Sequence, residues 1–94
     1  MAYTFEWDAE KADANERKHG VTFSEASTAF SDPLSATIDD PDHSRDEQRF
    51  VLFGISERGR LLAVMHAERD DVIRIISARR ATRTEQREYE GEDL

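Results

Sequence analysis

The stretch RFVLFGISERGRLLAVMHAERDDVIRIISAR, residues 49–79, holds most of the strand-forming side chains of the chain. Two apolar runs, 49–55 and 61–67, are joined by Ser-Glu-Arg-Gly-Arg, whose glycine suits the positive φ of a hairpin turn. Asp70-Asp71 forms a second turn into 72–79, which is apolar on both faces and is therefore predicted to be a central strand. The stretch predicts three consecutive antiparallel strands.

The amino-terminal segment predicts a strand followed by a helix. The aromatic residues of 3–7 alternate with polar ones, which is typical of a short strand with its aromatic face in the core. Asp8 is the predicted cap of a helix over roughly 9–19, and Gly20 supplies the left-handed stop.

Four further elements complete the prediction. They are a second helix over 23–30, capped by Ser24 and stopped by Asp32-Pro33, a weak strand at about 34–39, a final helix that starts with the capping box Thr82-Arg83-Thr84-Glu85 and runs through about Glu90, and a frayed end at 91–94. The order of these elements predicts an α+β fold, with a small antiparallel sheet, two N-terminal helices and one C-terminal helix.

Length and composition limit the class of protein. Ninety-four residues can bury one modest core, so we expect a single domain over 1–94. The chain has no cysteine, which excludes disulfide scaffolds, thiol nucleophiles and cysteine zinc sites. No apolar run approaches the length of a membrane span and no signal peptide is present, so the expected location is the cytoplasm, away from membranes.

Charge is distributed unevenly along the chain. The total is −8, from 13 basic and 21 acidic residues. Residues 1–44 carry 3 bases and 10 acids, residues 45–87 carry 10 bases and 7 acids, and residues 88–94 carry 4 acids. All bases of the middle block are arginines, which bind phosphate or carboxylate through two parallel hydrogen bonds. The total argues against nucleic acid as a ligand, whereas the middle block leaves it open.

Arginines gather on the last strand and just after it. Arg74 stands on the face opposite Ile73 and Ile75, and Arg79 and Arg80 lie where the strand becomes a loop. One interpretation is a phosphate-binding cluster. The alternative is that these arginines form ion pairs with nearby acids such as Glu85.

Proton transfer requires other side chains, because arginine stays protonated at any useful pH. The candidates are Lys18, His19, Glu85 and Tyr89, while His66, on an apolar face, is equally explained as a hydrogen-bonded core residue. Residues 39–43, Asp-Asp-Pro-Asp-His, lack the spacing of a calcium or zinc site and predict a solvated turn. No cofactor or metal is expected.

One set of segments, taken together in chain order, resembles a known family. These segments are Phe5-Glu6-Trp7-Asp8, Lys11-Ala12, Asn15, Lys18-His19-Gly20-Val21, Phe23, Glu25-Ala26, Asp32-Pro33-Leu34, Glu47, Arg49 and Arg74-Ile75-Ile76-Ser77-Ala78-Arg79. The set resembles the BrnT toxins, RelE-like ribonucleases of bacterial type II toxin–antitoxin systems, over about residues 5–89. The resemblance implies a RelE-like fold. It also implies a BrnA-like ribbon-helix-helix antitoxin as partner, a toxin–antitoxin heterotetramer, and contact with operator DNA only through the antitoxin.

The activity implied by the resemblance is metal-independent cleavage of RNA by the neighbouring 2′-hydroxyl, which inhibits translation and growth. Such a reaction needs a base, cations for the charge on phosphate, and an acid for the leaving oxygen. The resemblance assigns phosphate stabilisation first to Arg79 and Arg80, with Arg49 and Arg74 behind them. It leaves two pairs open for proton transfer, Lys18 with His19 and Glu85 with Tyr89.

Two other functions remain open at this point. The charge of −8 opposes RNA binding, which favours a catalytically weak module that binds the antitoxin and completes a repressor. In the third alternative, the arginines of a small α/β protein only make ion pairs.

Overall fold

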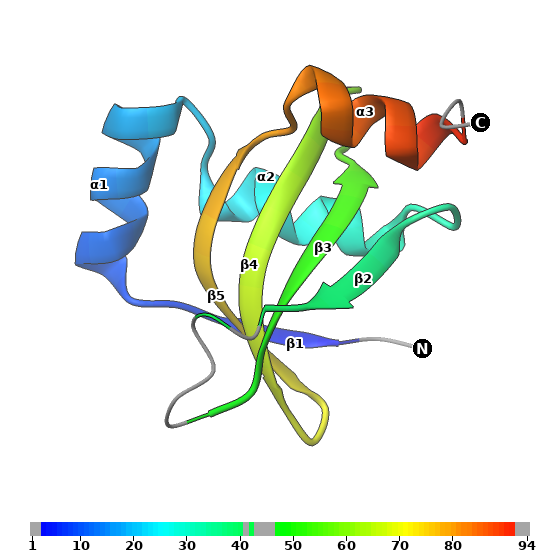
Figure 1. Ribbon diagram of the computed structural model, residues 1–94. Coiled ribbons are helices and arrows are strands. Elements are labelled where there is room, and N and C mark those ends of the chain that lie inside the picture. Colours follow the sequence, from blue (N-terminus) through cyan, green and yellow to red (C-terminus); the bar gives the residue numbers. More distant parts are fainter. Residues whose placement is uncertain (1–2, 41, 43–46, 92–94) are drawn as a thin grey trace.

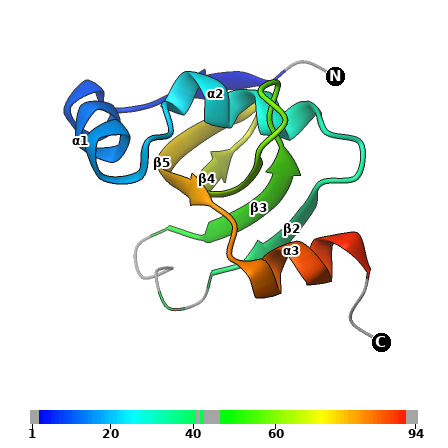
Figure 2. The ribbon, with the colours of Figure 1, turned by 90° about the horizontal axis from the view of Figure 1, so that it is seen from above.

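The computed structural model describes residues 3–40, 42 and 47–91. Its elements, in chain order, are β1 (Thr4–Glu6), α1 (Ala9–His19), α2 (Phe23–Thr28), a 3-10 turn (Ala29–Ser31), β2 (Ala36–Asp39), β3 (Arg49–Ile55), β4 (Leu61–Arg69), β5 (Val72–Arg80) and α3 (Arg83–Glu90). The strands form one sheet in the order β1-β5-β4-β3-β2 (Figure 1). In Figure 2, α2 covers one face of the sheet, α1 lies beside its β5 edge, and α3 crosses the other face.

The two predicted hairpins are confirmed. The turn between β3 and β4 places Gly59 at φ 78°, and the turn between β4 and β5 places Asp70 at φ 56°. The prediction that 72–79 is the central strand was wrong in detail, because β4 occupies the middle of the sheet. β5 is still an inner strand, with β4 on one side and β1 along its first three residues on the other, and its Ile73, Ile75 and Ala78 are buried in the core.

The prediction of an antiparallel sheet was also wrong, because the sheet is mixed. β1 pairs in parallel with β5, with Thr4 opposite Val72 and Glu6 opposite Arg74. The remaining pairs are antiparallel. Hairpins fix the direction of neighbouring strands, but β1 and β5 are separated by most of the chain, and no local pattern specifies their relative direction.

Helix ends agree with the predictions except in α2. Asp8 caps α1, accepting from Lys11 N at 2.9 Å, and Gly20 ends it in the left-handed region. The capping box of α3 is complete. In α2, by contrast, the cap is Thr22 rather than Ser24, and the α-helix ends at Thr28 and continues only as the 3-10 turn. Thr22 is the cap because its hydroxyl oxygen accepts a hydrogen bond from the backbone N–H of Glu25 at 3.0 Å.

The core lies between the sheet and the layer formed by α1 and α2. Its largest fully buried side chains are Phe23, Leu62, Ile75, His66, Val21 and Val64. Phe5 packs against this core, and Trp7 contacts the core residue Phe23 edge-on although it is 39% exposed, whereas Tyr3 is 48% exposed. The predicted core role of residues 3–7 was therefore wrong for Tyr3 and holds only in part for Trp7; both lie beyond the ends of the short strand.

Asn15 joins α1 to the outer edge of β5. Its Nδ2 donates to the carbonyls of Ala78 and Val21 at 2.8 and 3.0 Å, and its Oδ1 accepts from Ala78 N at 3.1 Å. Since β1 pairs with β5 only as far as Arg74, the buried amide of Asn15 satisfies backbone groups of the edge that β1 leaves uncovered.

Some predictions fall outside the described residues. These concern Pro41 and His43 of the acidic turn, and residues 92–94 of the expected frayed end. Within the described ranges, no helix is both long enough and apolar enough to cross a membrane.

Candidate active site

The face of the sheet that α3 crosses, called here the α3 face, carries arginines at both ends. The register places the side chains of Phe53, Ala63 and Arg79 in one row across β3, β4 and β5. Four residues earlier in β3, a second row joins Arg49, Ala67 and Arg74. The rows are separated by about 13 Å of strand.

A bulge in β5 puts Arg74 and Arg79 on the same face. Met65 pairs with Ser77 but His66 pairs with Ile75, so Ile76 is an extra residue in the strand. Strict alternation would turn two residues five positions apart to opposite faces. The bulge reverses the alternation once, and Arg79 therefore shares a face with Arg74, whereas Arg80, opposite the core residue Leu62, lies on the other face.

The guanidinium of Arg79 is held by α3. Nη1 and Nη2 donate to the two carboxylate oxygens of Glu85 at 2.8 and 2.9 Å, and Glu85 Oε1 also accepts from Thr82 N at 2.8 Å. The hydrogen bonds from Arg79 outweigh desolvation and lower the pKa of Glu85 from 4.5 to about 2. The same bonds raise the pKa of Arg79. The predicted ion pair between Arg79 and Glu85 is thus present in the structure. This ion pair holds the guanidinium of Arg79 on the α3 face.

Tyr89, one turn later, gives α3 a second anchor. Its hydroxyl donates to Asp32 Oδ2 at 2.5 Å. Burial, then the hydrogen bond to Asp32, raises the pKa of Tyr89 to about 12. Burial also acts to raise the pKa of Asp32, but hydrogen bonds from Tyr89 and from two backbone N–H groups outweigh it and lower that pKa. No residue of α3 is fully buried, so the helix is held chiefly by these two polar contacts.

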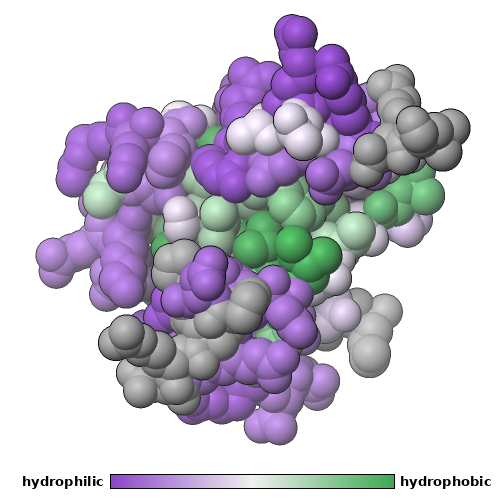
Figure 3. Space-filling view, viewed as in Figure 1, coloured by the Kyte–Doolittle hydropathy of each residue, from purple (hydrophilic) through white to green (hydrophobic). Residues whose placement is uncertain are grey.

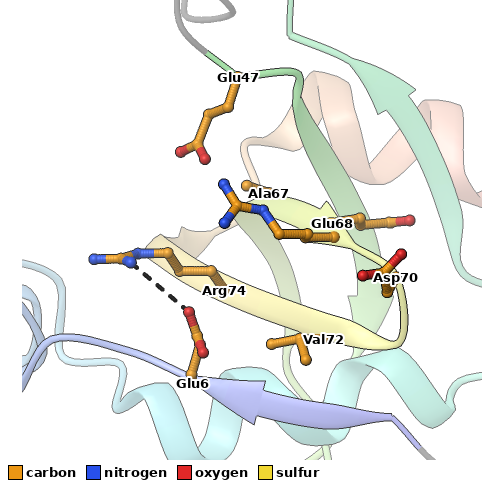
Figure 4. A pocket seen from close by; sticks show the side chains of 8 residues that line it. Glu6, Glu47, Ala67, Glu68, Asp70, Val72 and Arg74 are labelled. Carbon is orange, nitrogen blue, oxygen red and sulfur yellow. Dashed lines mark ion pairs between the residues drawn. The ribbon is translucent and has the colours of Figure 1, made fainter.

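Arg49 and Arg74 lie at the other end of the face and each has a glutamate nearby. Arg74 Nη1 is 3.7 Å from Glu6 Oε2, and Arg49 Nε is 3.7 Å from Glu47 Oε1. Arg74 and Glu6 border a pocket of about 220 Å³, with Glu47 facing them across it (Figure 4). The pocket is lined by Glu6, Glu47, Ala67, Glu68, Arg69, Asp70, Val72 and Arg74.

The structure does not place Lys18 and His19 on the α3 face. They occupy the last turn of α1, beside the β5 edge, where Lys18 is exposed and His19 is half-buried (Figure 2). His66 is fully buried, with Nδ1 3.2 Å from Val64 O and Nε2 2.9 Å from Glu68 Oε2. Of the two interpretations of His66, a proton-transfer residue or a hydrogen-bonded core residue, the structure supports the second.

Two carboxylates were missed as organising residues. Asp32 was interpreted only as a helix stop, although the Asp-Pro pair also suits a turn in which Leu34 N donates to Oδ1 at 2.9 Å. Glu25 is buried and binds Arg60 through both oxygens, which ties α2 to the β3–β4 turn. An acid between the apolar residues Phe23 and Ala26 was the available signal for Glu25.

No group of three or more metal-ligating side chains occurs within residues 3–40, 42 and 47–91. On the α3 face, the described chemistry is that of guanidinium groups, carboxylates and a phenol above an apolar sheet. Such a set can bind anionic groups and orient them, provided that the anion competes with the glutamate partners.

Comparison with known proteins identifies the family and the fold. The family model described as "Ribonuclease toxin, BrnT, of type II toxin-antitoxin system" matches residues 7–85. The crystal structure of the ribonuclease toxin BrnT of Brucella abortus shares the fold, with a TM-score of 0.62, 21% sequence identity, and coverage of 87% of this chain and all of that one. No curated protein matches. The match over most of its length shows that the chain belongs to the BrnT family of ribonuclease toxins of type II toxin–antitoxin systems.

Proposed function

We propose that this chain is a metal-independent endoribonuclease whose active site lies on the α3 face around Arg79. The observation that carries the proposal is the position of Arg79. The bulge turns its side chain to this face, and Glu85 holds the guanidinium there through two hydrogen bonds. A guanidinium fixed in this way can stabilise phosphate charge as soon as an anionic oxygen replaces one carboxylate contact.

In the proposed reaction, the 2′-oxygen attacks the adjacent phosphorus and the bond from phosphorus to the 5′-oxygen breaks. A base takes the proton of the 2′-hydroxyl, an acid protonates the leaving oxygen, and the products are a 2′,3′-cyclic phosphate and a 5′-hydroxyl. Arg79 stabilises the charge on the non-bridging oxygens. Arg74 and Arg49, about 13 Å away on the same face, are suited to hold the RNA backbone further along.

Arg80 has a different position from the other arginines. Its side chain leaves the strand on the face of α1 and α2, so we assign it a supporting role rather than a share of the same phosphate. Proton transfer stays with the two pairs named from the sequence. Glu85, with a pKa near 2, and Tyr89, with a pKa near 12, are far from the neutral range in which acid–base catalysis is most efficient. This favours Lys18 and His19, which lie in the last turn of α1 beside β5, the strand that carries Arg79.

The test is expression of the chain and its Arg79→Ala variant from a tightly controlled promoter, with growth and total RNA followed within minutes. We expect arrest and RNA loss in the parent only. Arg79→Lys should restore little activity, because lysine lacks the two parallel donors. Arg83→Ala is the matched control, since Arg83 is an exposed arginine at the start of α3. Circular dichroism of each variant separates lost chemistry from lost folding. Arrest by a folded Arg79→Ala variant would contradict the assignment.

The family assignment gives this toxin an antitoxin, and we propose that it is a BrnA-like ribbon-helix-helix protein. The proposed complex is a heterotetramer that reaches operator DNA only through the antitoxin. Size-exclusion chromatography with light scattering, on the chain co-expressed with the protein encoded beside it, tests the stoichiometry. We also retain the RelE-like relationship, the inhibition of translation and the cytoplasmic location as parts of the proposal.

One observation favours a second candidate, a catalytically weak module that acts as antitoxin partner and co-repressor. Arg79 is already occupied by Glu85, and the chain carries a net charge of −8, so an RNA phosphate must displace a carboxylate against long-range repulsion. A folded parent that binds the antitoxin but causes neither arrest nor RNA loss would establish this second function.

A further inference from the structure

A groove runs between α3 and the β2 edge of the sheet. Its volume is about 130 Å³, and it is lined by Ala36, Ile38, Phe53, Glu85, Glu88 and Tyr89. Figure 3 shows this face, with apolar surface between the polar surface of α3 and the polar surface below it. A space of this order accepts an apolar group of about the size of a benzene ring.

The floor of the groove is apolar and uncovered. Ile38 is 55% exposed, although it is a large aliphatic residue in a strand, and every residue of β2 is exposed. β2 is also the last strand in the order of the sheet. Exposed apolar surface next to a sheet edge is a common feature of surfaces that bind another chain.

The rim of the groove is acidic, and this indicates the charge of the occupant. Both charged residues that line the groove are glutamates of α3, Glu85 and Glu88. Glu88 is exposed on the rim. Whereas Glu85 is paired with Arg79, the side chain of Glu88 makes no hydrogen bond or ion pair with the rest of the described chain.

We propose that this groove binds a basic segment of the antitoxin that inserts an apolar side chain over Ile38 and places its cations against Glu88. The inference rests on the proposed function, because it requires an antitoxin. RNA is a poorer fit for the same place, since its phosphates would face the carboxylate of Glu88, which is unpaired within the described chain. Glu85 lines the groove and also holds Arg79, so a segment seated there lies directly beside the proposed phosphate site.

The experiment measures the affinity of this chain for the purified protein encoded beside it, by isothermal titration calorimetry at two salt concentrations. Ile38→Ser removes the apolar contact and Glu88→Lys reverses the charge of the rim. Each has a matched control away from the groove. Leu34→Ser changes a hydrophobic residue that is 74% exposed but does not line the groove, and Glu16→Lys reverses an exposed charge on α1.

We expect Ile38→Ser and Glu88→Lys each to weaken binding about tenfold or more, which is typical of central interface residues. Glu88→Lys should also reduce the dependence of affinity on salt. Leu34→Ser and Glu16→Lys should change the affinity by less than about twofold. Thermal unfolding of each variant checks that the fold is intact.

Equal affinity of all four variants and the parent for the antitoxin would overturn the proposal that the groove binds it, while leaving the toxin–antitoxin function in place. A parent that does not bind the protein at all would overturn the antitoxin partner and the groove together. An Ile38→Ser variant with unchanged antitoxin affinity but weaker binding of a single-stranded RNA oligonucleotide would assign the groove to substrate, and would also overturn the proposal.

Discussion

The ion pair between Arg79 and Glu85 makes a prediction that can be worked out from the structure. Glu85→Gln removes the charge but keeps a side-chain oxygen that can accept the hydrogen bond from Thr82 N, so it isolates the electrostatic part. The pKa of Glu85 falls from 4.5 to about 2, and each unit corresponds to about 1.36 kcal/mol, which gives an upper limit of about 3.4 kcal/mol. The side chains are 30% and 23% exposed, and solvent screening reduces the expected contribution to about 1–2 kcal/mol.

The sign with pH follows from the direction of the shift. Because the folded pKa is depressed, the stabilisation is present above the ordinary pKa of 4.5 and is lost as the pH falls towards 2. The stability of α3 in Glu85→Gln should therefore match that of the parent near pH 2 and fall furthest below it at neutral pH.

Native-state amide hydrogen exchange of α3 is the suitable assay, because a helix with no buried residue can open without unfolding the core. At pH 7 we expect the protection of α3 amides to fall by about 5- to 30-fold in Glu85→Gln, the factor that corresponds to 1–2 kcal/mol. Unchanged protection at neutral pH, or a loss that is equal at pH 7 and near pH 2, would refute the reasoning.

Three further predictions concern packing and anchoring. Tyr89→Phe removes the hydrogen bond to Asp32 and should lower the opening free energy of α3, measured by amide exchange, by about 1 kcal/mol. In an ultraviolet titration of the same variant, the phenol ionisation near pH 12 should be missing. Glu25→Gln removes the charge of a buried carboxylate that binds the partly exposed Arg60 and should lower the free energy of unfolding in urea by about 1.5 kcal/mol; an unchanged midpoint would contradict it. Gly54→Ala places a Cβ 2.6 Å from a backbone carbonyl of the 3-10 turn and should cost about 1–3 kcal/mol in the same assay, and an unchanged midpoint would show that the turn can move.

Local features of the fold were predictable because the residues that determine them are close in sequence. The capping box of α3 lies within four residues, and the β3–β4 hairpin needs only two apolar runs around Gly59. The start of the second helix was predicted wrongly because two hydroxyl residues only two positions apart, Thr22 and Ser24, both suit a helix cap. The parallel pairing of β1 could not be found in this way, because it depends on contacts across most of the chain.

The candidate site shows the same division. Arg79 and Glu85 are six residues apart, and their pairing was among the alternatives weighed from the sequence. The contact between Asp32 and Tyr89 spans 57 positions and leaves no periodic trace. The sequence did not single out Glu6 as a neighbour of Arg74, because it is the parallel strand β1 that brings it alongside.

The bulge in β5 makes the number of residues between two arginines a property of the site. In a regular strand, side chains share a face only at even separations, so an arginine pair five positions apart can act together only where an extra residue interrupts the count. If the strand became regular with all of its residues kept, Arg79 would turn towards the helices although every charge in the sequence stayed the same. Deletion of the extra residue Ile76 would instead leave both arginines on one face at a separation of four. The site therefore depends on the bulge together with the spacing, and a relative with the two arginines five positions apart but without a bulge presents a different surface.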